Sequence, residues 1–90
     1  MTTVTLFTDT WFQGASKTFD YADINLANDY LFPFSNWYNQ ASSMIVSDGT
    51  VRFFDLLYQN GAHWDVTEGS YGTMADAGMA DNSIGSFAFL

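Results

Sequence analysis

Residues 4–14 read VTLFTDTWFQG, and residues 51–61 repeat them imperfectly as VRFFDLLYQNG. Each copy opens with a strand-like apolar run and ends on glycine. A unit of this size cannot bury its own apolar face, so each copy must pack against its twin. The repeat therefore predicts a single domain, residues 1–90, made of two halves at about 1–47 and about 50–90.

Short strands and frequent turns dominate the rest of the chain. Residues 4–7 alternate in polarity and carry threonine and aromatic residues, which favour strands. Turns are indicated at Asn60-Gly61 and at residues 47–49. The predicted fold class is all-β, a two-sheet sandwich with short helical turns in its connections. Further strands are expected at residues 19–21, 43–46, 51–55, 64–66 and 86–89, helical turns at 24–31 and 74–78, and a bend at Tyr71 between Gly69 and Gly72.

The composition is strongly acidic. Ten carboxylates face two permanent cations, Lys17 and Arg52, and the formal net charge is −8. Nucleic acids and anionic membranes are excluded as partners, because binding to either depends on Lys and Arg side chains. The absence of cysteine excludes disulfides, thiolate metal sites and cysteine nucleophiles. We expect a soluble monomer that attracts cations.

The amino-terminal residues do not have the pattern of a secretory signal. Residues 1–3 lead directly into the first strand without a charged segment. No apolar run approaches the roughly 18 residues that a membrane-spanning helix requires. This pattern favours a cytoplasmic protein and leaves secretion open.

The two repeated stretches resemble the Greek-key signature of the βγ-crystallin family. That signature is an aromatic residue, four residues of any type, Phe or Tyr, one further residue and then Gly. Phe7, Phe12 and Gly14 satisfy it in the first copy. In the second copy Gln59 replaces the second aromatic residue and Tyr58 lies one place early, so we expect a looser or bulged hairpin there. The resemblance covers nearly the whole chain and implies a sandwich of two Greek-key motifs.

The polar clusters of the two halves resemble the family's calcium motif, which reads Asn or Asp twice, two variable residues, Ser or Thr, and Ser. The matching windows are residues 38–43 and 81–86. The resemblance implies that each calcium ion takes a backbone carbonyl from a hairpin, groups from one window and a hydroxyl from the other. The better site would comprise the Asp55 carbonyl, Asn82, Ser83 and the Ser42 hydroxyl, with Asp81 adding charge.

The second site departs from the family pattern at two positions. It would combine the Thr8 carbonyl with Asn39 and Gln40, and it needs a hydroxyl at position 85. Gly85 supplies no hydroxyl, and Tyr38 stands where Asn or Asp belongs. We expect this degenerate site to be empty or weak. Because the better site holds few carboxylates, any calcium affinity there is expected in the ~10⁻⁴ to 10⁻³ M range.

A purely structural role for the same residues stays open. Ser, Asn and Asp at a tight connection can hydrogen-bond neighbouring backbone groups without any metal. The resemblance implies that the last serine of each window, Ser43 and Ser86, pins the folded hairpin rather than touching calcium. Two alternatives therefore remain, one residual weak calcium site or a scaffold that binds no metal.

Few residues favour catalysis. His63 is the only histidine, and the sequence contains no nucleophile elbow beside which it would act. Asp9 and Asp55 take comparable positions near the hairpins, but turn and surface roles are far more common for such residues. We therefore expect no enzymatic activity.

The main functional expectation is a structural, highly soluble and stable protein, with calcium as the one cofactor implied. An aromatic-rich stretch at residues 30–38 supports an alternative, because exposed aromatic side chains can stack on sugars or anchor a partner. In that alternative the chain is a recognition module for a carbohydrate or a protein.

Overall fold

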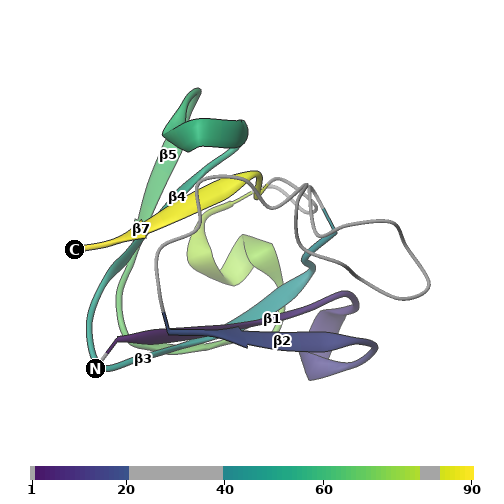
Figure 1. The fold of residues 1–90 in the computed structure, drawn as a ribbon. Helices are drawn as coiled ribbons and strands as arrows, with labels where there is room; N and C mark the ends of the chain where they lie inside the picture. The colour runs from purple at the N-terminus through teal and green to yellow at the C-terminus, as the bar shows by residue number, and fades with distance from the viewer. Residues whose placement is uncertain (1, 21–39, 80–83) are drawn as a thin grey trace.

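The computed structural model describes residues 2–20, 40–79 and 84–90. Within these ranges the chain forms seven strands in two antiparallel sheets, and its helices are short 3-10 turns (Figure 1). The predicted all-β sandwich is confirmed. The first sheet has the order β2-β1-β3-β6 and the second β5-β4-β7. The elements are β1 (Thr3–Phe7), η1 (Thr10–Phe12), β2 (Ser16–Phe19), β3 (Ser43–Ser47), β4 (Val51–Phe54), η3 (Leu57–Gln59), β5 (His63–Val66), β6 (Gly69–Tyr71), η4 (Met74–Ala77) and β7 (Ser86–Phe89).

Strand β1 carries the alternation that the opening sequence predicts. Val4 and Leu6 are fully buried, whereas the residues on either side of them are only partly covered. Successive side chains of a strand point to opposite faces, so the apolar set faces the interior. β1 pairs with both β2 and β3 and lies inside the first sheet. β2 begins at Ser16, earlier than the return strand predicted at residues 19–21.

The second half of the chain adds a strand to the first sheet. β6 pairs antiparallel with β3, from Met44↔Tyr71 to Val46↔Gly69. The bend predicted at Tyr71 is therefore wrong, because this residue ends a strand. Its ring lies beside Gly69, and its hydroxyl donates a 2.7 Å hydrogen bond to the Thr67 carbonyl. The two halves are thus joined by backbone hydrogen bonds as well as by their side chains.

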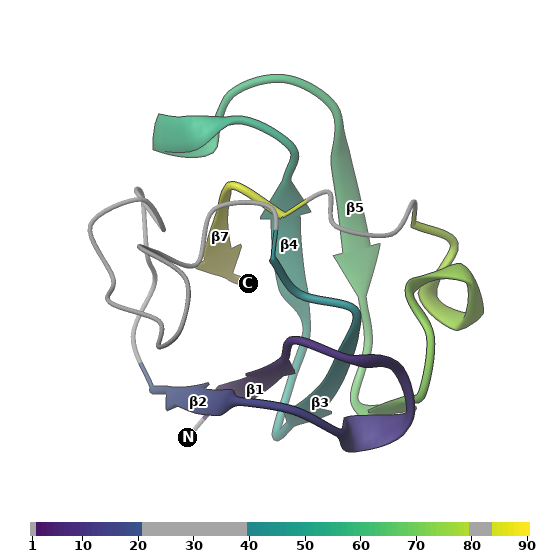
Figure 2. The same cartoon turned by 90° about the vertical axis from the view of Figure 1, so that its right-hand side faces the viewer.

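The second sheet is built around β4, which pairs with β5 on one side and β7 on the other. Val51 and Phe53 of β4 are fully buried and face the first sheet. The chain enters β4 through a turn at Asp48 and Gly49, which have φ values of 59° and 145°. Figures 1 and 2 show the two sheets as separate layers that face one another.

One interior fills the space between the sheets. Phe19 of the first sheet packs edge-on against Phe87 of the second, with ring centroids 5.1 Å apart and planes at 79°. Phe87 also contacts Phe53, at 5.9 Å between centroids. Such tilted aromatic pairs stabilise a core beyond the area that they bury. The fully or nearly fully buried apolar residues are Val4, Leu6, Phe19, Ala41, Met44, Val46, Val51, Phe53, Val66, Met74, Met79, Ile84 and Phe87.

An ion pair crosses the outer face of the second sheet. Arg52 on β4 lies opposite Asp65 on β5 and donates two hydrogen bonds to its carboxylate, from Nε at 2.7 Å and from Nη2 at 2.9 Å. The hydrogen bond from Arg52 is the main cause that lowers the pKa of Asp65 below its ordinary value, and the nearby His63 acts in the same direction. Both side chains are partly exposed, so the pair is screened by solvent and salt.

Replacing Arg52 with Gln should destabilise the domain at neutral pH but not in strong acid. The lowered pKa of Asp65 means that the ion pair stabilises the fold fully above the unfolded pKa of about 3.9. This contribution is lost as the pH falls through the folded pKa of Asp65. Urea midpoints of the two proteins, measured at several pH values, should therefore converge below the folded pKa. A difference between them that does not depend on pH would assign the effect to lost packing of the Arg52 side chain instead.

Candidate functional site

The two signature hairpins fold into matching corners. In η1 the backbone of Trp11 and Phe12 is left-handed, with φ values of 56° and 63°. In η3 the equivalent Tyr58 and Gln59 both have φ of 58°. Each non-glycine residue in this region costs of order 1–2 kcal/mol, so two in succession persist only where the surroundings hold them. The corners are therefore the parts of the fold where local strain must be offset by specific contacts.

A buried serine holds each corner. Ser43 Oγ accepts a 3.0 Å hydrogen bond from the Phe12 N–H and donates one of 2.6 Å to the Asp9 carbonyl. In the second half Ser86 Oγ accepts a 2.8 Å bond from the Gln59 N–H and donates one of 2.7 Å to a carbonyl of the same corner, that of Leu56. Both serines are fully buried. The pinning role that the sequence implied for these two serines is thus present in both halves.

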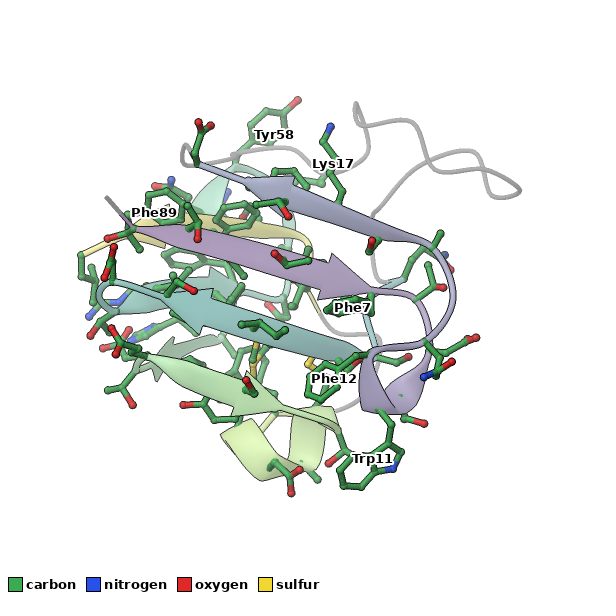
Figure 3. The ribbon with its side chains drawn as sticks, turned by 90° about the horizontal axis from the view of Figure 1, so that it is seen from below. Phe7, Trp11, Phe12, Lys17, Tyr58 and Phe89 are labelled. Atoms are coloured by element: carbon green, nitrogen blue, oxygen red, sulfur yellow. The ribbon has the colours of Figure 1, made fainter. Side chains whose placement is uncertain are left out.

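The corner that contains Gln59 is as tightly folded as the first. In the first copy Phe12 packs edge-on against Phe7, with centroids 5.5 Å apart (Figure 3). In the second copy Phe54 contacts His63 instead, at 6.0 Å. The expected looser or bulged hairpin is wrong. The backbone of the corner is held by its bonds to the pinning serine, so the aromatic pair is not required for this geometry.

Glycine follows each corner because a side chain would not fit there. Gly14 and Gly61 have φ values of 80° and 81°, which other residues rarely adopt. A Cβ at Gly14 would overlap Thr8 Oγ1, and a Cβ at Gly61 would overlap Asp55 Oδ1. The glycine of the signature thus lets the residue that follows the strand fold its side chain back into the hairpin.

Corner η1 also touches the second half of the chain. The Trp11 N–H donates a 2.6 Å hydrogen bond to the Gly72 carbonyl, and the indole ring lies over Gly72 so closely that a Cβ there would overlap it. The ring nevertheless stays 62% exposed. Figure 3 shows Trp11 at the edge of the molecule beside η4, with Tyr58 of the other corner at the opposite edge.

The residues expected to supply the calcium-binding hydroxyl occupy matched backbone positions. The Ser42 N–H donates to the Phe7 carbonyl, and the Gly85 N–H donates to the Phe54 carbonyl, both at 2.8 Å. Ser42 and Gly85 therefore stand in the same relation to their hairpins. One position carries a hydroxyl and the other carries no side chain, so the two halves differ in what they can offer a metal.

Asp55 and Thr8 also occupy matched positions. The Thr8 N–H donates to the Ala15 carbonyl at 2.9 Å, and the Asp55 N–H donates to the Ala62 carbonyl at 3.1 Å. The suggested correspondence of Asp55 with Asp9 is therefore wrong. Equivalent residues of the two corners are forty-seven positions apart, so the residue that matches Asp9 is Leu56.

The side chains of the matched residues Thr8 and Asp55 differ in their hydrogen bonding. Thr8 Oγ1 accepts a 3.0 Å hydrogen bond from the Ala15 N–H. Asp55 Oδ1 is buried, yet it accepts no hydrogen bond in the part of the chain that the structure describes. A buried carboxylate oxygen without a partner is costly, and a cation or water nearby offsets that cost. The sequence analysis assigned only the backbone carbonyl of Asp55 as a calcium ligand. It did not reveal this orphaned side-chain oxygen, which is buried without a hydrogen-bond partner among the described residues.

Several predicted ligands lie outside the described residues, namely Asn39, Asp81, Asn82 and Ser83. Gln40 is half-buried shortly before β3, and Ser42 is buried beside it. How the two windows approach one another therefore stays a prediction. The aromatic stretch 30–38 also lies outside the described residues, so the recognition hypothesis stays a prediction as well.

The described ranges offer little support for a carboxylate or histidine metal cluster, a catalytic histidine or a membrane-spanning helix. No three His, Asp or Glu side chains gather there as a metal-binding group. His63 lies exposed at the start of β5, where its ring contacts Phe54. The described residues contain no helix with the length and apolar character to cross a membrane.

Comparison by sequence finds no matching family model and no matching curated protein. Comparison of the fold finds solved βγ-crystallins. One from an archaeon is 28% identical, covers 99% of this chain and 98% of its own, and has a TM-score of 0.86. One from Ciona intestinalis is 24% identical, covers 98% and 99%, and has a TM-score of 0.84. A transition-metal-ion-binding βγ-crystallin from Methanosaeta thermophila is 24% identical, covers 96% and 98%, and has a TM-score of 0.76.

The structural match and the sequence signatures agree. The likeness extends over nearly the full length of both partners, including neighbours that consist of a single such domain. The two signature hairpins, their pinning serines and the strand that the second half adds to the first sheet all lie within the matched region. The chain therefore has the βγ-crystallin fold over nearly its whole length.

Proposed function

We propose that this chain is a structural protein whose fold is stabilised by calcium at one site rather than two. The observation that carries the proposal is the difference between Ser42 and Gly85 at matched backbone positions. A hydroxyl ligand is available at only one of them, so only one site of the family type is complete. The net charge of −8 supports the attraction of a divalent cation.

The proposed ligands are those of the better site: the Asp55 carbonyl, the Ser42 hydroxyl, Asn82 and Ser83, with Asp81 adding charge. Calcium prefers such oxygen ligands and supplies the positive charge that holds them together. Asp55 follows β4 and Ser42 precedes β3, so an ion bound to both would tie the second sheet to the first. The orphaned Oδ1 of Asp55 favours a cation on this side of the molecule. Thr8, Asn39 and Gln40 are left without a complete site.

We propose no catalytic role for the chain. Its solved neighbours are βγ-crystallin domains, a family that is generally not enzymatic. The proposed role is that of a stable, acidic structural domain that stays soluble when it accumulates to high concentration. Calcium then acts by binding the native state and not the unfolded chain, which raises the free energy of unfolding.

Calcium should raise the melting temperature more than sodium chloride of equal ionic strength. At ten times Kd, a ligand that binds only the native state stabilises it by about 1.4 kcal/mol. For a domain of this size that corresponds to roughly 6–11 °C. Ser42→Ala should abolish the calcium response, because it removes the hydroxyl ligand. Calorimetric titration and thermal unfolding of chelator-treated protein measure both effects.

The matched variants separate a lost ligand from a damaged fold. Ser47→Ala, at an exposed position at the end of the strand that follows Ser42, should leave the calcium response intact. Gly85→Ser should add a second, weaker response, whereas Gly85→Ala adds the same bulk without the hydroxyl and should not. A calcium response that survives Ser42→Ala would overturn the assignment of ligands. A wild-type protein that responds to nickel or zinc but not to calcium would overturn the choice of metal.

A further inference from the structure

The end of the second corner carries a dipeptide with its own chemistry. Asn60 is the one asparagine in the sequence that is followed by glycine. Both Asn60 and Gly61 are exposed, directly after η3. Asn60 has an extended backbone, with φ −115° and ψ 168°, and Gly61 is left-handed with φ 81°. The asparagine side chain therefore stands at the surface next to the Gly61 nitrogen, and the Asp55 and Leu56 side chains approach Gly61 from the side on which a Cβ would lie.

That peptide nitrogen is available as a nucleophile. The Gly61 N–H makes no hydrogen bond to any residue in the described ranges. The Asn60 carboxamide is held loosely, through one 3.2 Å bond from Nδ2 to the Leu57 carbonyl. The nearest backbone bond, from the Leu56 N–H to the Asn60 carbonyl, is long at 3.3 Å. Local rotation about the Cα–C bond of Asn60 thus breaks few contacts.

We propose that Asn60 is a site of spontaneous deamidation in the folded protein. The Gly61 nitrogen attacks Cγ of Asn60, a new C–N bond closes a five-membered imide, and the side-chain nitrogen leaves as ammonia with the proton of the Gly61 amide. Water then opens the imide at either carbonyl, which gives aspartate or isoaspartate at position 60. The step needs no cofactor, oxidant or enzyme, and water is its only co-reactant.

The first corner provides a matched reference inside the same molecule. Gln13-Gly14 occupies the equivalent place, with φ −106° and ψ 170° at Gln13 and φ 80° at Gly14. Gln13 also donates from its carboxamide to a corner carbonyl, that of Trp11, at 3.3 Å. Backbone and exposure are thus alike in the two corners. Glutamine has one more methylene, so its imide would be a less readily closed six-membered ring.

Conversion of Asn60 should weaken the corner that holds it. Aspartate has no N–H to give the Leu57 carbonyl and places a carboxylate against it, so an attraction becomes a repulsion. Isoaspartate also lengthens the main chain within a corner whose strained residues depend on the bonds of Ser86. Each event adds one negative charge to a chain that already carries a net charge of −8. Aged molecules should therefore be more acidic and less stable than new ones.

The sequence allows the two corners to be read separately by peptide mass spectrometry. Cleavage after Lys17 releases residues 1–17, which contain Gln13 and no asparagine. Cleavage after Arg52 and after Glu68 releases residues 53–68, in which Asn60 is the only asparagine. Folded protein is incubated at neutral pH below its melting temperature, and acid and isoaspartate are counted over time in these two fragments and in the remaining asparagine-containing ones.

The expected result is conversion at Asn60 at least about tenfold faster than at Gln13, a difference in barrier of about 1.4 kcal/mol. Asn60→Gln should remove the modification, and Gln13→Asn should create a new one in the first corner. Asn60→Asp should reproduce the charge and the lower melting temperature of aged protein. The proposal is overturned if Asn60 stays intact in the folded protein while it converts in urea-unfolded protein, or if another asparagine converts first.

Discussion

Replacing Phe87 with Ala should lower the free energy of unfolding by about 4 kcal/mol, within the 3–5 kcal/mol typical of buried phenylalanine. Phe87 is fully buried and contacts both Phe19 and Phe53. Truncation removes its apolar area, leaves a cavity between the sheets and breaks two tilted ring contacts. The free energy of unfolding of such domains is about 5–15 kcal/mol in total, so the loss is a large share of the stability.

The position of Phe87 also predicts where the damage will be felt. It lies on β7 of the second sheet, but Phe19 belongs to β2 of the first. Because both sheets share one interior, amide hydrogens of β1 and β3 should lose as much exchange protection as those of β4. Hydrogen exchange of wild type and variant measures this, with Phe87→Leu as a milder control that keeps most of the volume. Unchanged protection in β1 would mean that the two sheets are stabilised independently.

Ser43→Ala and Ser86→Ala should each destabilise the domain by about 2–4 kcal/mol. Each substitution leaves one partly buried N–H and one carbonyl without their serine partner, and an unsatisfied group costs about 1–3 kcal/mol where it is buried. It also frees a corner that contains two left-handed residues, which the serine otherwise holds. For a domain of 90 residues the loss corresponds to roughly 10–30 °C in melting temperature.

The two serine variants test whether both corners work alike. Their effects should be similar, although one corner contains Phe12 and the other Gln59. Ser47→Ala removes an exposed hydroxyl at the end of β3 and should change the stability by no more than about 0.5 kcal/mol. A large loss from Ser43→Ala with little from Ser86→Ala would show that the Phe7–Phe12 ring contact, and not the serine, determines corner strength. Urea unfolding of the three variants side by side distinguishes these outcomes.

Much of the site was visible in the sequence because it rests on local chemistry. The repeated hairpins and their terminal glycines occupy short windows whose residue types follow from backbone geometry, and the resemblance to the family's motifs indicated the pinning serines. The missing hydroxyl at Gly85 could be read in the same way. The structure added that Ser42 and Gly85 make the same hydrogen bond to their hairpins, which is what makes the comparison between them meaningful.

Other features had no local signature. Strand β6 is three residues long, is bounded by glycine and carries no alternation of apolar residues, so its sequence predicts a bend rather than a strand. It is a strand only because β3 offers it a backbone edge. The orphaned Oδ1 of Asp55 likewise depends on how the hairpin folds its side chain inward.

The amino-acid order alone indicated the two-sheet class and the pairing of two halves, because these depend on periodicity and on an internal repeat. The serines that pin the corners were indicated only through the family resemblance, since each lies about thirty residues from the corner that it holds. The addition of β6 to the first sheet, the tolerance of Gln59 at a left-handed corner and the contact of Trp11 with Gly72 became apparent only in three dimensions. In each of these cases the stabilising partner is a backbone group or a buried side chain from a distant part of the chain. Such a partner leaves no mark on the neighbouring sequence, so only the folded arrangement reveals it.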